Sequence, residues 1–221
     1  MKTTAFNITQ MRPFLTILLV LLSYTLNAQN KAKILLDEVS TKVETYDNIA
    51  LSFKYALVNV EENINQETLG DVILQGNKYV LNILGITRIF DGETLFSISA
   101  EDEEVTISSE NAQDDNTITP SKMLFFYEDG YNYEMDIIQN IKERKIQYIK
   151  LNPIDSNSEI NYILLGIDLK TKHIYNLIEV GINNTKTILT VNSFKTNEPL
   201  SKTLFTFDKE KYKDFYINKI D

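Results

Sequence analysis

The single histidine is the first residue to consider for chemistry, because imidazole serves both metal sites and acid–base catalysis. His173 ends a Lys-Thr-Lys-His stretch that leads into a β-prone run, and the chain contains no cysteine. A common zinc site needs further histidines or a set of thiolates. The sequence therefore predicts that His173 is a surface turn residue and that the protein holds no metal.

Carboxylates provide the other candidate chemistry. Glu101 to Glu104 form an acidic run that could act as an acid–base pair or as a cation site. No glycine shapes this run into a calcium loop, so we interpret it, like Asp114-Asp115, as a solvated turn. The motifs G-x-S-x-G, G-x-x-x-x-G-K-[ST] and G-x-G-x-x-G do not occur in the sequence. We therefore expect a protein that is not an enzyme and uses no cofactor.

The composition is typical of one folded domain with an acidic surface. The chain has 221 residues, 43% of them hydrophobic, with 31 acidic residues against 22 basic ones. Nucleic-acid binding relies on clustered lysine and arginine, so this charge balance argues against DNA or RNA as a partner. The lack of cysteine excludes disulfide bonds and a lipid-modified N-terminal cysteine.

The N-terminus has the pattern of a secretory signal peptide over residues 1–28. An apolar run, Phe14 to Leu22, follows basic residues and leads into a small-residue stretch that ends near Ala28. The run is too short for a transmembrane helix, which needs roughly 20 residues. We expect cleavage near Ala28 and one exported domain over residues 29–221, which would be periplasmic in a Gram-negative bacterium, with either Met1 or Met11 as the true start.

The mature sequence begins with an amphipathic helix and continues as strands. Between Lys31 and Tyr46, the residues Leu35, Val39 and Val43 share one helical face with polar residues opposite. From Ile49 onward the hydrophobic period changes to two, and turn signals such as Asp91-Gly92 separate the runs. The predicted strands are Ile49–Leu57, Leu69–Leu74, Lys78–Leu84, Ile86–Phe90, Thr94–Ala100, Val105–Ser108, Tyr131–Ile138, Lys145–Leu151, Glu159–Leu169, His173–Val180, Lys186–Phe194 and Thr203–Phe207.

A short helix is predicted between the two groups of strands. A polar loop, Glu110 to Thr119, ends with Thr119 as a helix cap and Pro120 as a first-turn proline. The helix then covers Ser121 to Tyr127 and carries five bulky apolar or aromatic residues in a row. One turn and a half cannot hide them on a single face, so other parts of the protein must cover both sides.

This order of elements predicts an α+β, β-rich fold. Roughly 10–11 short antiparallel strands exceed what a flat sheet comfortably holds, so the sheet must curve. The two helices then fit inside the concavity, where sheet and helices enclose apolar side chains. Alternation alone does not tell whether those side chains fill a core or line a pocket.

Several segments resemble a known family in order and spacing. They are the amphipathic helix leading into Leu51-Ser52-Phe53-Lys54, then Gly70–Leu74, the hairpin Ile89–Phe96 with Glu104-Val105-Thr106 behind it, the helix Thr119–Leu124 and the closing run Leu204–Asp208. Together they are similar to the LolA-type periplasmic carriers of outer-membrane lipoproteins. Within this family, the segments most resemble those of divergent carriers from the Bacteroidetes branch.

Two departures from the family concern how the fold closes. Many members have Arg-Pro after the second strand, where the arginine is thought to latch a helical lid, whereas this chain has Gly76-Asn77. The family's hairpin tryptophan is replaced by Phe96, and its aromatic strand residue appears as Tyr79. No arginine latch carries over, while the apolar lining is retained in kind.

The resemblance implies an unclosed, curved barrel whose concave face is covered by helices over an apolar cavity for acyl chains. It implies a monomer that takes acylated lipoproteins from an ATP-driven inner-membrane release complex to an outer-membrane acceptor or to the outer membrane itself. The alternative is a periplasmic lipid- or lipoprotein-sensing regulatory domain on the same half-barrel. The residues expected to form the cavity and its lid are Leu35, Val39, Val43, Phe53, Tyr79, Phe96, Met123, Leu124 and Phe126.

Overall fold

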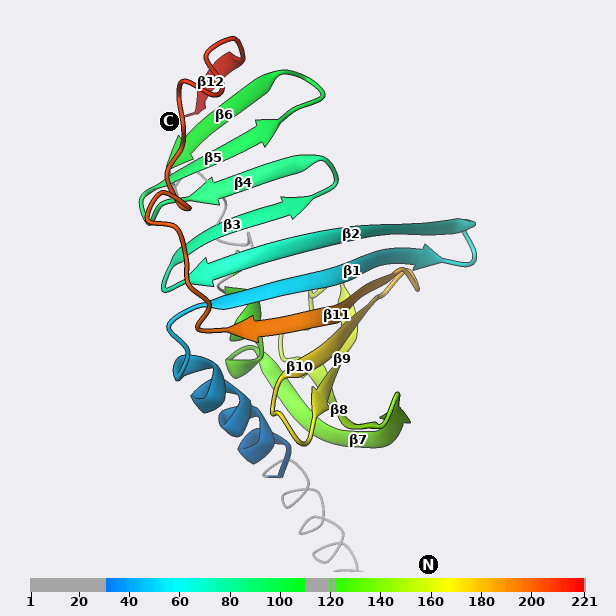
Figure 1. Cartoon of the computed structure of the whole chain (residues 1–221). Coiled ribbons are helices and arrows are strands. Elements are labelled where there is room, and N and C mark those ends of the chain that lie inside the picture. The colour runs from blue at the N-terminus through cyan, green and yellow to red at the C-terminus, as the bar shows by residue number, and fades with distance from the viewer. Residues whose placement is uncertain (1–30, 110–119, 121, 221) are drawn as a thin grey trace, which may run out of the picture.

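The computed structural model describes residues 31–109, 120 and 122–220 (Figure 1). The predicted signal peptide with its cleavage point near Ala28, the polar loop with Asp114-Asp115 and the cap Thr119 lie outside the described residues. Within the described ranges, no helix is both long enough and apolar enough to cross a bilayer.

A single curved sheet dominates the described part of the chain and contains twelve strands. The strand order is β12-β6-β5-β4-β3-β2-β1-β11-β10-β9-β8-β7, and the outermost strands β12 and β7 do not meet, so the barrel is unclosed (Figure 1). All pairs are antiparallel except β12 with β6. The bounds are β1 Ile49–Asn59, β2 Ile64–Gln75, β3 Lys78–Ile83, β4 Ile86–Phe90, β5 Thr94–Ser99, β6 Glu104–Ser109, β7 Tyr131–Ile141, β8 Arg144–Pro153, β9 Ile160–Asp168, β10 Ile174–Gly181, β11 Lys186–Thr196 and β12 Tyr216–Ile220.

The Asp91-Gly92 turn joins β4 to β5 as the sequence predicts. The Asp91 carboxylate accepts hydrogen bonds from the backbone N–H groups of Glu93, at 2.9 Å, and Thr94, at 2.8 Å. Gly92 has a φ of +107°, which side-chain-bearing residues rarely adopt. This local chemistry fixes the register of the two strands.

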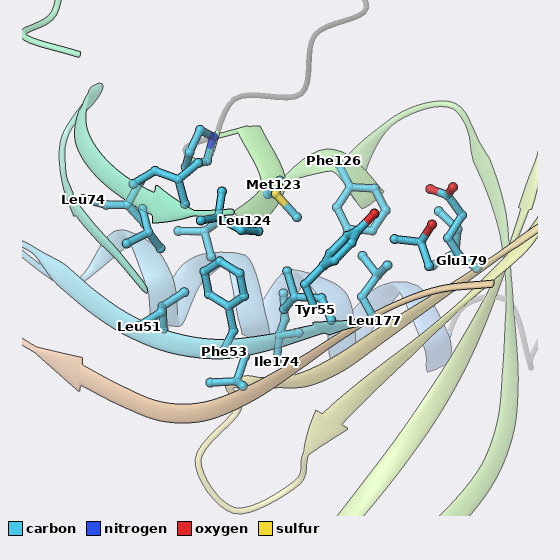
Figure 2. Close-up of a pocket in the computed structure, with 18 of the residues that line it drawn as sticks. Leu51, Phe53, Tyr55, Leu74, Met123, Leu124, Phe126, Ile174, Leu177 and Glu179 are labelled. Carbon is cyan, nitrogen blue, oxygen red and sulfur yellow. The ribbon is translucent and has the colours of Figure 1, made fainter. Parts of the chain in front are cut away.

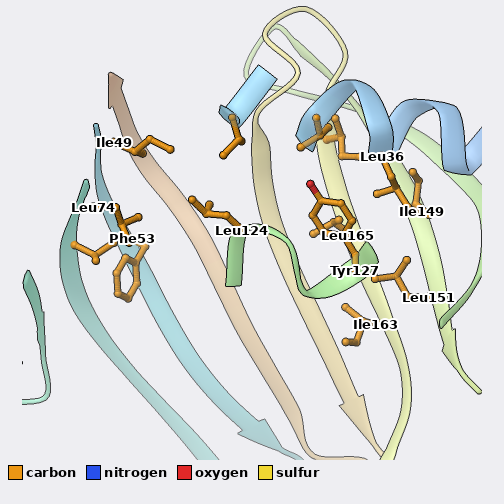
Figure 3. Packing of buried hydrophobic residues seen from close by; sticks show 14 of the residues in the cluster. Leu36, Ile49, Phe53, Leu74, Leu124, Tyr127, Ile149, Leu151, Ile163 and Leu165 are labelled. Carbon is orange, nitrogen blue, oxygen red and sulfur yellow. The ribbon is translucent and has the colours of Figure 1, made fainter. Parts of the chain in front are cut away.

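The predicted N-terminal helix is confirmed over residues 31–44. Its Leu36 and Val39 belong to one hydrophobic cluster with Ile149 of β8 and Leu165 of β9, and Figure 3 shows Leu36 above these strands. None of the four side chains is more than 3% exposed. The concave face beneath the helix is therefore filled by closely packed side chains.

The predicted helix over Ser121–Tyr127 forms as two separate 3₁₀ turns, η3 (Lys122–Leu124) and η4 (Phe126–Glu128). Phe125 between them has φ −130° and ψ 1°, outside the α-helical region. Leu124 of η3 and Tyr127 of η4 are both buried. The break distributes the bulky residues over several directions, which a single α-helix could not do.

The prediction of a strand at Thr203–Phe207 is wrong, and Leu204–Asp208, which resemble the family's closing strand, form no strand either. These residues form turns, in which the Leu204 N–H bonds to the Ser201 carbonyl at 3.2 Å. The Phe207 ring stacks on Phe96 with ring centroids 4.6 Å apart. The aromatic side chain of Phe207 is therefore partly buried by packing on the face of the sheet opposite the main core, without strand pairing. The edge position beside β6 is taken by β12.

Candidate ligand-binding cavity

An apolar cavity of about 280 Å³ lies on the concave face of the sheet. Figure 2 shows it between β1, which carries Phe53 and Tyr55, and the segment that carries Met123 and Phe126. The lining residues are Leu51, Phe53, Tyr55, Val72, Leu74, Leu81, Ile83, Pro120, Met123, Leu124, Phe126, Tyr131, Ile160, Ile163, Ile174, Leu177, Glu179, Thr187, Leu189, Val191 and Phe194.

Strand periodicity builds the sheet side of the cavity. Leu51, Phe53 and Tyr55 are two residues apart along β1, so they point to the same face. Phe53 lies opposite Gly70 of β2, and a Cβ atom at Gly70 would come within 2.6 Å of the Phe53 ring. Glycine at this position therefore leaves the space that the aromatic ring occupies.

The other side of the cavity is formed by residues 120 and 122–128, which we call the cover. Tyr133 of β7 donates its hydroxyl to the backbone carbonyls of Tyr127 and Glu128, each at 2.8 Å. The Tyr127 hydroxyl also lies 3.3 Å from the Ser40 hydroxyl on the N-terminal helix. Burial raises the pKa of Tyr127 to about 12, so this hydroxyl is neutral at physiological pH. These contacts fasten the C-terminal end of the cover.

Glu179 of β10 is the charged exception among the described lining residues. Its half-buried carboxyl lies among apolar side chains, and this desolvation raises its pKa. Burial, with a smaller contribution from the Glu179 charge, also raises the pKa of the nearby Tyr131. The cavity is therefore apolar along most of its length and carries one carboxyl group.

Four of the nine residues expected from the sequence come together at this cavity. Phe53 lines it from the sheet, and Met123, Leu124 and Phe126 line it from the cover. Figure 2 shows their side chains directed into the same space.

The other five expected residues lie elsewhere. Leu35, Val39 and Val43 are buried in the main core cluster, and Tyr79 is buried in the same cluster. Phe96 belongs to a second cluster on the opposite face of the sheet. None of the five is a lining residue of the cavity.

The sequence interpretation missed the contribution of β10 and β11. Leu177 of β10 pairs with Leu189 of β11, and both line the cavity together with Ile174 and Val191. Part of the signal was present, because Leu189 and Val191 are two residues apart in a run that was predicted as a strand. What the sequence did not show is that β11 pairs with β1 and so joins these strands to the cavity.

His173 lies in a turn, as the sequence predicts, but it is half buried rather than fully exposed. It lies in the turn before β10, where its ring stacks on Phe194 with centroids 3.8 Å apart. Its Nε2 atom is 2.8 Å from the Tyr46 hydroxyl. Burial is the main reason that the pKa of His173 is lowered. A half-buried histidine held by two aromatic neighbours is a packing element here, and no cluster of three or more metal-ligating side chains exists among the described residues.

An unclosed barrel with an apolar cavity under a short cover defines a class of proteins that bind apolar ligands. The family model described as "Outer membrane lipoprotein carrier protein LolA" matches residues 86–208, more than half of the chain. The chain therefore belongs to the LolA family, whose fold is that of lipid- and lipoprotein-binding carriers. No curated protein sequence matches the chain.

Solved structures resemble this chain at low sequence identity. An uncharacterized conserved protein from Thermus thermophilus is 11% identical and shares the fold, with a TM-score of 0.59 over 86% of this chain and 99% of that chain. Lipoprotein LppX from Mycobacterium tuberculosis is 15% identical, with a TM-score of 0.48 over 76% of this chain and 98% of that chain. A LolA superfamily protein from Nitrosomonas europaea is 11% identical, with a TM-score of 0.41 over 80% and 98%.

Proposed function

We propose that the protein is a periplasmic carrier that binds the acyl chains of lipoproteins and shuttles them from the inner to the outer membrane. The observation that carries this proposal is the apolar cavity between the sheet and the cover, in a chain of the LolA family. Phe53, Met123, Leu124 and Phe126 are the residues proposed to contact the acyl chain.

Burial of methylene groups is sufficient to drive such binding. Each methylene group transferred from water contributes about 0.8 kcal/mol, whereas micromolar affinity corresponds to about 8.2 kcal/mol. Roughly ten sheltered methylene groups therefore match that affinity before the entropic costs of association are subtracted. No reactive group is needed for this function.

Movement of the cover follows from the size of the cavity. Its volume of about 280 Å³ lies just below the range of ligand pockets, which is about 300–1,000 Å³. A whole acyl chain enters only if the cover moves away from the sheet. The Tyr133 and Ser40 contacts of the cover are neutral hydrogen bonds, worth about 1 kcal/mol each. We propose that they act as the latch in place of the family's arginine.

The cellular setting is part of the same proposal. A signal peptide over residues 1–28 would direct export, and the mature domain would comprise residues 29–221 in the periplasm. Its partners would be an ATP-driven lipoprotein-release complex in the inner membrane and an acceptor at the outer membrane, or that membrane itself.

Native mass spectrometry of the protein purified from its own periplasm tests the proposal directly. We expect bound species with the masses of acylated proteins or lipids. Phe126→Asp places a charge in the cavity and should abolish this binding with unchanged far-UV circular dichroism. Phe207→Asp is the matched control, because Phe207 lies in the cluster on the opposite face and its substitution should preserve binding.

Two results would decide against the carrier. Absence of any lipid mass from the native protein would remove the proposed ligand. Capture of one regulatory protein partner without acylated proteins, in a pull-down from periplasmic extract, would favour the lipoprotein-sensing alternative.

A further inference from the structure

Glu179 gives the cavity two chemically different ends. Leu51 and Leu74 lie at one end of the labelled side chains in Figure 2, and Glu179 lies at the other. Glu179 pairs in register with Ile163 of β9 and Thr187 of β11, and all three residues line the cavity. A carboxyl group is therefore built into the sheet at the boundary of an apolar space.

No basic side chain faces this carboxyl within the described lining. The titratable groups that line the cavity besides Glu179 are Tyr55 from β1 and Tyr131 from β7, whereas β9, β11 and the cover contribute none. No ion pair joins Glu179 to another described residue. Ionising a half-buried carboxyl among apolar groups is costly, which is why its pKa is raised. A ligand that supplied a cation or N–H donors would relieve this cost.

We propose that the Glu179 carboxylate binds an ammonium or other N–H-bearing head group of an amphiphile whose acyl tail lies between the sheet and the cover. This inference rests on the proposed function and names the polar part of its ligand. A charge-assisted hydrogen bond is shorter and stronger than a neutral one, especially where water is partly excluded. An anionic head group would meet the carboxylate with like charge, so the cavity discriminates between head groups of opposite sign.

Two amphiphiles with the same tail test the proposal at pH 7.5, below their micellar concentrations. We expect wild-type protein to bind dodecylammonium about tenfold more tightly than dodecanoate, measured by titration calorimetry. Glu179→Gln should reduce this preference to near unity while retaining binding of both tails. Glu159→Gln is the matched control, because Glu159 is exposed and does not line the cavity, so the preference should persist.

The outcomes separate this proposal from the carrier function. Equal binding of both probes by wild-type protein, or a preference that survives Glu179→Gln, overturns the role of Glu179 and leaves the acyl site intact. Failure of wild-type protein to bind either probe overturns the acyl site and the Glu179 proposal together.

A second measurement covers the case in which the variant does not fold. Wild-type affinity for dodecylammonium should fall as acid protonates Glu179, because this is the one carboxyl group among the described residues that line the cavity. A constant affinity across acid pH overturns the proposal.

Discussion

The concave face has two parts that differ in how completely they are filled. Between the N-terminal helix and the sheet, residues such as Val39, Ile149 and Leu165 have no exposed surface. Beneath the cover, residues such as Leu81 and Leu177 are only half buried, and the cavity separates them from the cover. One sheet therefore carries a solid core and an open apolar site side by side.

The regularity of the covering element explains the difference. The helix over residues 31–44 presents an apolar residue every three or four positions, which gives a continuous stripe against the sheet. The cover consists of two 3₁₀ turns broken at Phe125, so its side chains point in several directions and leave space. The cavity arises where the cover is too short and irregular to fill the concavity.

Matched truncations of two leucines should give the largest effect. Leu165→Ala removes a fully buried side chain and should lower the free energy of unfolding by about 3 kcal/mol. Leu177→Ala enlarges an existing cavity and should cost only about 1 kcal/mol, because its side chain already lacks neighbours on one side. Urea unfolding measures both values. Equal losses would mean that the cavity part is packed as tightly as the core.

Local patterns were sufficient to predict most of the fold. Alternation and turn chemistry identified β1 to β11, since each of these strands has an apolar face and a nearby turn signal. The pattern failed at Thr203–Phe207, where aromatic stacking rather than strand pairing buries the side chains. It also missed Tyr216–Ile220, because β12 pairs in parallel with β6, over 100 residues away in the sequence.

The cavity was predictable only in part, because a pattern of period two does not say which face is concave. Phe96 was expected in the site, yet its neighbour Leu95 is the residue that packs into the main core. A shift of one residue moves a side chain to the other face of a sheet. The cover residues Met123 and Phe126 were found because a run of bulky residues needs contacts on several sides.

Tyr133→Phe should loosen the cover and leave the N-terminal helix unchanged. The substitution removes one hydroxyl that donates to two carbonyls of the cover, which should cost about 1 kcal/mol. Hydrogen exchange should accelerate in residues 122–128 and stay unchanged in the N-terminal helix. Tyr162→Phe is the control, because Tyr162 lies outside both the cavity and the cover contacts. Unchanged exchange in the cover would show that this hydroxyl does not hold it closed.

Glu179→Gln should produce the smallest change in the free energy of unfolding. Whether the variant is more or less stable than wild type is informative. Burial raises the pKa of Glu179 in the folded protein, so the folded state holds this proton more tightly than the unfolded chain does. The stability that the protonated carboxyl contributes is fully present below pH 4.5 and is lost as the pH rises through the raised pKa. The variant should therefore unfold at higher urea than wild type at pH 7 and show no such gain at pH 4. Because the carboxyl is half exposed, we expect less than about 1 kcal/mol.

Exposed Glu159 should show no comparable pH-dependent gain when it is changed to glutamine. A loss of stability in Glu179→Gln at pH 7 would mean that the carboxylate has a favourable partner within the protein. The expected gain would mean that the Glu179 carboxylate has no favourable partner among the side chains of the unliganded protein. A charge kept against the stability of the unliganded protein is best explained by a ligand that pairs with it.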